Sequence, residues 1–83
     1  MRQMWITFRS LTHAQRAMMV LERKGITASL TRAPKELSLR GCAYAVILRK
    51  KIGEAVKLIE ELKLPAAQYY ERLDSGEFRE GKF

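Results

Sequence analysis

The most reactive side chain in this sequence belongs to Cys42, which is the only cysteine. A thiolate is a strong nucleophile, and neighbouring positive charge favours it over the thiol. His13, the only histidine, is a candidate proton partner for such a thiol. The sequence therefore offers one site for sulfur chemistry, although a lone cysteine can equally serve as a small buried apolar residue.

Other catalytic or metal-binding patterns are missing from the sequence. It has no glycine-rich phosphate loop, no Ser-His-Asp set and no Cys/His cluster with metal-ligand spacing. One Cys and one His cannot complete a tetrahedral metal site within a monomer. A chain of 83 residues also buries only a thin core, which disfavours a deep active site. We therefore expect a protein that is not an enzyme and that holds no metal and no resident cofactor.

Two segments show the spacing of amphipathic helices, and these helices must help to position Cys42. The first spans residues 11–24, capped by Ser10 or Thr12 and ended by Gly25. The second runs from about Lys51 to Lys63 and stops before Pro65. Each has a single apolar stripe with intervals of three and four, made by Leu11, Ala14, Ala17, Met18 and Leu21, and by Ile52, Ala55, Val56, Ile59 and Leu62.

Four segments are typical of strands because they alternate in polarity or are rich in β-branched and aromatic residues: 3–8, 26–32, 42–49 and 67–73. Residues 33–41 read as a loop and residues 75–83 as a flexible C-terminal tail. The order β-α-β-β-α-β predicts one α+β domain over residues 1–74. Right-handed crossovers then favour a ferredoxin-like two-layer sandwich, with an antiparallel four-stranded sheet and two helices on one face.

This topology places Cys42 among positive charges. The strand that begins at Cys42 starts at the sheet edge where strands 3–8 and 26–32 end and where the first helix begins. The positive end of that helix dipole favours a thiolate there. Gly41 allows the backbone to turn sharply before the thiol. The basic residues expected near the same edge are Arg9, Arg32, Lys35 and Arg40.

Two stretches of the chain resemble a known family. Residues 33–46 read Ala-Pro-Lys-Glu-Leu-Ser-Leu-Arg-Gly-Cys-Ala-Tyr-Ala-Val, and residues 6–14 read Ile-Thr-Phe-Arg-Ser-Leu-Thr-His-Ala. They resemble the small bacterial family of selenium/sulfur carrier protein-like domains. Members open with a strand and a Ser/Thr-rich helix start, and carry a Pro-Arg/Lys-Glu-Ile/Leu-Ser segment shortly before a Cys beside a Gly. The resemblance covers residues 4 to about 73.

The resemblance implies that Cys42 carries sulfur or selenium as a persulfide or selenopersulfide. The cargo would come from a donor protein such as a cysteine desulfurase and pass to an acceptor protein. In this interpretation Cys42 is the carrier thiol and there is no catalytic residue. The residues that would stabilise its anion are Arg40, Gly41, Arg32, Lys35 and Arg9, with Ser10, His13, Pro34 and Ser38 around them.

The charge distribution supports an alternative function. Residues 1–53 hold eleven Lys or Arg and two acids, a net charge of +9, whereas residues 54–83 have a net charge of −2. A basic half attracts anionic partners, among them nucleic acid, acidic proteins and small ligands. Trp5, Tyr44, Tyr69 and Tyr70 would then be either a base-stacking platform or ordinary sheet packing. The alternative is therefore a ferredoxin-like binding module with a structural Cys42, and a homodimer is one way to cover a bare sheet face.

The compartment follows from the cysteine content and the hydropathy pattern. A single cysteine forms no intramolecular disulfide, which is typical of a reducing compartment. The first residues enter a strand-like run and do not resemble a signal peptide. No apolar stretch approaches the ~20 residues of a membrane helix. We expect a cytoplasmic protein with no membrane association.

Overall fold

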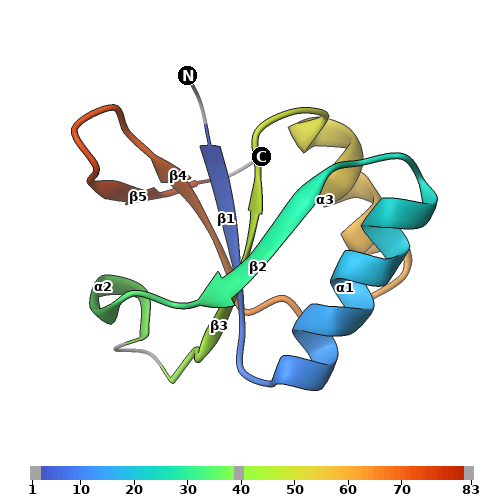
Figure 1. The fold of residues 1–83 in the computed structure, drawn as a ribbon, viewed down its shortest axis with the longest axis horizontal. Helices are drawn as coiled ribbons and strands as arrows, with labels where there is room; N and C mark the ends of the chain where they lie inside the picture. Colours follow the sequence, from blue (N-terminus) through green and yellow to red (C-terminus); the bar gives the residue numbers. More distant parts are fainter. Residues whose placement is uncertain (1–2, 39–40, 82–83) are drawn as a thin grey trace.

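The computed structural model describes residues 3–38 and 41–81. Within these residues the protein is an α+β domain with one five-stranded antiparallel sheet in the order β2-β3-β1-β4-β5 (Figure 1). The elements in chain order are β1 (Gln3–Phe8), α1 (Leu11–Arg23), β2 (Ala28–Arg32), α2 (Lys35–Ser38), β3 (Tyr44–Leu48), α3 (Ile52–Glu61), β4 (Gln68–Arg72) and β5 (Phe78–Glu80).

The ends of α1 follow from local sequence. The Ser10 hydroxyl accepts a hydrogen bond from the backbone N–H of His13 at 3.2 Å, so Ser10 is the N-cap. At the other end Gly25 adopts a φ of +74°, and the N–H of Ile26 donates to the carbonyl of Leu21 at 2.9 Å. Such a left-handed residue satisfies the last carbonyls of a helix, and glycine adopts it at little cost.

Helices α1 and α3 lie together on one face of the sheet (Figure 1). Their apolar stripes pack against the residues of β1 and β3 that point to this side. Because successive side chains of a strand alternate between faces, Met4, Ile6 and Phe8 all point toward the helices. The buried members of this main core are Met4, Ile6, Phe8, Ala14, Ala17, Leu21, Ile26, Val46, Leu48, Ala55, Val56 and Ile59.

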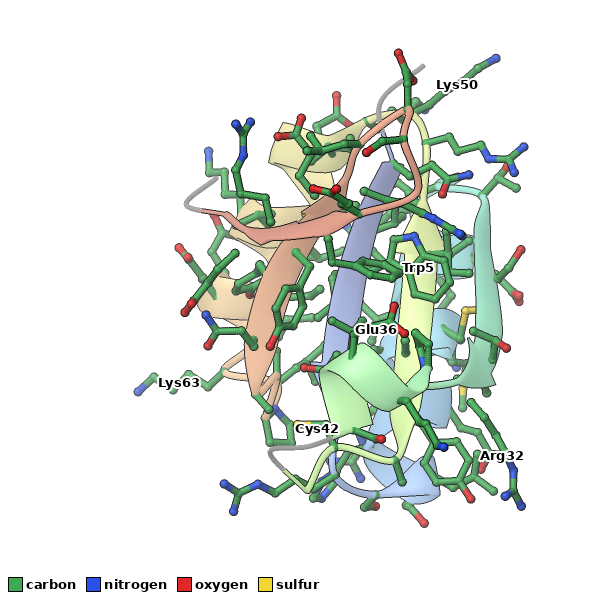
Figure 2. All side chains as sticks on the ribbon, turned by 90° about the vertical axis from the view of Figure 1, so that its left-hand side faces the viewer. Trp5, Arg32, Glu36, Cys42, Lys50 and Lys63 are labelled. Carbon is green, nitrogen blue, oxygen red and sulfur yellow. The ribbon has the colours of Figure 1, made fainter. Side chains whose placement is uncertain are left out.

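A second, smaller core lies on the opposite face, which Figure 2 shows in front. Trp5, Leu37 and Ala45 are its buried members, and Phe78 packs against them. The Trp5 and Phe78 rings meet edge to face, with centroids 5.0 Å apart. The Arg72 guanidinium carbon lies 5.4 Å from the centroid of the Trp5 ring, within cation–π range. The short helix α2 and the β4–β5 hairpin therefore cover part of this face.

The prediction of a four-stranded sheet with two helices is wrong on two counts. Residues 33–41 were expected to be a loop, but they contain α2, in which Leu37 and Ser38 donate backbone hydrogen bonds to the Pro34 carbonyl. Residues 75–83 were expected to be a flexible tail, but Phe78–Glu80 form β5, which pairs with β4. Both additions pack on Trp5 or beside it, so contacts between distant parts of the chain stabilise them.

Candidate functional site

The candidate site is the sheet edge at which β1 and β2 end and β3, β4 and α1 begin. Phe8 and Arg32 both lie opposite Tyr44, the first residue of β3. One residue further, the N–H of Ala33 donates to the carbonyl of Ala43 at 2.9 Å. Continuing this register by one more residue places Cys42 beside Pro34. The strand order therefore brings Cys42 close to the residues that follow β1 and β2.

Cys42 lies in the short segment between α2 and β3, not in a strand as the predicted range 42–49 implied. Figure 2 shows it at the lower edge of the sheet, below α2. Its exposed fraction is 3%, whereas its neighbours Gly41 and Ala43 are exposed. Gly41 has a φ of +82° and donates its N–H to the Ser38 carbonyl at 2.9 Å. The thiol is therefore covered, although the backbone on either side of it is open to solvent.

Three of the four predicted basic residues lie near this edge. Arg9 follows β1, Arg32 ends β2 and Lys35 begins α2, and all three are exposed. Figure 2 shows Arg32 on the β2 side of the edge, apart from Cys42. Arg40 lies outside the described residues. These groups contribute a positive field that solvent screens, and no guanidinium of the described residues bonds to the thiol.

The predicted polar neighbours have structural partners. Ser10 caps α1 by accepting the N–H of His13, whose side chain is half-buried. The Ser38 hydroxyl donates to the carbonyl of Lys35 at 3.2 Å, and the Pro34 carbonyl accepts two N–H groups of α2. The hydrogen bonds of Ser10, Pro34 and Ser38 thus shape the helix ends that flank Cys42.

Sequence reasoning missed Leu37. Its side chain is only 2% exposed and packs with Trp5 and Ala45. It lies five residues before the thiol, on the single helical turn that Figure 2 shows above Cys42. The available signal was one apolar residue in an otherwise polar segment, which indicates a buried contact. Leu37 therefore holds α2 against the sheet, next to the segment that leads to Cys42.

The four aromatic residues do not form one stacking platform. Trp5 and Tyr70 belong to the smaller core, whereas Tyr44 and Tyr69 pack against the main core on the helical side of the sheet. Tyr69 and Tyr70 are consecutive residues of β4, so their side chains point to opposite faces of the sheet. Sheet packing therefore accounts for these rings.

Residues 3–38 and 41–81 contain no group of three or more His, Cys, Asp or Glu side chains placed to hold a metal ion. No helix in the same ranges has the length and apolar content needed to cross a membrane.

The fold and the site define a small α+β domain with one cysteine between a helical turn and a central strand. The model of the family described as "Putative Se/S carrier protein-like" matches residues 3–71, and the chain belongs to this family. The match includes Cys42, the α2 segment and the two long helices. Neither the curated proteins nor the solved structures that were compared with the chain include a significant match.

Proposed function

We propose that the protein is a carrier of sulfur or selenium, with the chalcogen bound to Cys42 as a persulfide or selenopersulfide. Membership of the carrier-like family is the observation that carries this proposal. The position of Cys42 supports it, because the only thiol of the sequence lies at a sheet edge next to an exposed glycine turn. In this role the protein is not an enzyme and needs no resident cofactor, and it exchanges its cargo with partner proteins in the cytoplasm.

The transfer step conserves electrons. The Cys42 thiolate attacks the outer sulfur of a persulfide on a donor protein, such as a cysteine desulfurase. A new S–S bond forms on Cys42 as the S–S bond of the donor breaks, and the donor cysteine leaves as a thiolate. Passing the sulfur to an acceptor thiolate repeats the same exchange.

The burial of Cys42 adds a requirement to this proposal. A thiol with an exposed fraction of 3% cannot meet a protein-bound persulfide in the closed conformation. We propose that the α2 segment, which Figure 2 shows above Cys42, opens for transfer. Its only fully buried side chain among the described residues is that of Leu37, so opening removes few apolar contacts. The same burial protects a bound persulfide from water and from other thiols between transfers.

The test is acceptance of sulfur from a cysteine desulfurase supplied with labelled cysteine. Wild type should gain the mass of one sulfur atom, reversed by a thiol reductant, and Cys42→Ser should gain none. The control is Cys42→Ser combined with Ser29→Cys, which moves the only thiol to an exposed position on β2. Equal labelling of the control and wild type would show that any thiol suffices, and the carrier proposal would be wrong.

The buried thiol also favours the alternative, a binding module in which Cys42 is structural. In that case Cys42→Ala should fold and retain partner binding. The wild-type thiol should also accept no label, even when Leu37→Ala loosens α2. Labelling of wild type at a rate that rises with loosening of α2 would exclude this alternative.

We further propose that the part of the chain from β1 to β4 is a ferredoxin-like domain, to which α2 and β5 are additions. The order β2-β3-β1-β4 and the common face of α1 and α3 support this assignment.

A further inference from the structure

A groove lies on the sheet face opposite the long helices, at the end of the sheet away from Cys42. Its volume is about 580 Å³, within the range of ligand sites in proteins. Trp5 and Ile47 supply apolar lining, and Thr27 and Ser29 on the β2 side supply hydroxyl groups. Figure 2 shows Trp5 in the middle of this face and Lys50 at its upper end.

The charged lining of the groove has one sign. Arg49, Lys50 and Lys51 come from the turn that joins β3 to α3, and Arg72 comes from the end of β4. No carboxylate lines the groove among the described residues. Asp74 lines an adjoining hollow together with Arg72 and offsets its charge, so the proposal is based on Arg49, Lys50 and Lys51. All three are exposed, and their charges attract an anionic occupant.

The surroundings of the groove favour a peptide over a nucleic acid. Binding of single strands needs free aromatic faces on which bases stack. Trp5 is only 7% exposed, with Phe78 at its ring and Arg72 above it. By contrast, β2 is an edge strand of the sheet, and its outer side can pair with an extended peptide.

We propose that this groove binds an acidic segment of a partner protein, with one apolar side chain beside Ile47 and the small exposed part of Trp5, and flanking carboxylates beside Lys50 and Lys51. Arg49 lies roughly 23 Å from Cys42, since seven residues of extended chain at ~3.3 Å each separate them. A segment in the groove therefore leaves the thiol edge free. The proposal does not depend on the chemistry of Cys42, and Cys42→Ser should bind as wild type does.

The experiment uses a fluorescent peptide in which one phenylalanine is flanked on both sides by alternating Glu and Asp. We expect saturable binding at low salt, with NMR shifts at the Trp5 indole and the amides of Ser29 and Ile47. The variant Lys50→Glu with Lys51→Glu should weaken binding by about 10-fold, since it replaces two attractive charges beside the peptide with two repulsive ones. A peptide with glycine in place of phenylalanine should also bind more weakly.

The matched control is Arg16→Glu with Lys57→Glu, which changes the net charge equally at exposed positions of α1 and α3, on the other side of the sheet. This control should bind the peptide within about 2-fold of wild type, once the general attraction of the peptide to the protein's net charge is subtracted. Equal loss in both double variants would mean non-specific attraction and would overturn the proposal. Tighter binding of an oligouridine with the same NMR shifts would overturn it in favour of a nucleic-acid site. The NMR spectrum of each variant shows whether it is folded.

Discussion

The proposal that α2 covers Cys42 can be tested through Leu37. This side chain is 2% exposed and belongs to the smaller core with Trp5 and Ala45. The hydrogen bonds of Leu37 and Ser38 to Pro34 stay within the segment, so Leu37 supplies the apolar contact between α2 and the sheet. Replacing a buried leucine by alanine costs about 2–5 kcal/mol, and we take about 3 kcal/mol for Leu37→Ala.

The effect on Cys42 depends on how the thiol becomes accessible. If α2 opens locally, the ~3 kcal/mol lost in Leu37→Ala makes opening of α2 more favourable by the same amount. The alkylation rate of Cys42 should then rise about 100-fold, since ~1.36 kcal/mol is a factor of ten in an equilibrium constant. The control is Ile59→Ala, which removes a side chain of similar size that is 1% exposed in the main core. Ile59→Ala should lower the global stability by a similar amount but change the alkylation rate by less than about 3-fold.

The assay is alkylation by iodoacetamide under native conditions, followed by intact mass, with urea unfolding to give the global stability of each variant. Two results would refute the reasoning. If both variants accelerate alkylation in proportion to their loss of global stability, Cys42 reacts only from the unfolded protein. If Leu37→Ala leaves the rate unchanged, α2 is not the cover of the thiol.

Two further predictions concern single residues. Gly41→Ala should lower stability by about 1 kcal/mol because the φ of Gly41 is +82°, although no atom obstructs a Cβ there. Gly53→Ala within α3 should instead raise stability by up to ~1 kcal/mol. Urea unfolding measures both changes, and an unchanged stability of Gly41→Ala would show that this turn relaxes freely. Burial, and secondly the charge of Glu60, raise the pKa of Tyr69 above its ordinary value of 10.0. The unfolded chain then loses this proton at lower pH than the folded protein does, so stability should fall as pH rises above about 10. Glu60→Gln should lower the pKa of Tyr69 in an absorbance titration. Identical titration curves for Glu60→Gln and wild type would exclude Glu60 as a cause.

Local patterns in the sequence determined most of the elements. The predicted helices 11–24 and 51–63 correspond to α1 (Leu11–Arg23) and α3 (Ile52–Glu61), because apolar spacing and end signals act over a few residues. Strand 3–8 is β1 as predicted. The chain order then placed Cys42 at the edge where β1 and β2 end, since antiparallel neighbours alternate in direction.

Only the tertiary structure decided what covers the thiol. Polar segments with one apolar residue, such as those of α2 and β5, have too little local preference to form alone. They form because Leu37 and Phe78 pack with Trp5, which is distant from both in the sequence. β3 begins at Tyr44, Cys42 is buried just before it, and the basic groove lies at the other end of the sheet. Burial of a side chain depends on which distant residues pack over it, and no local pattern around Cys42 contains that information.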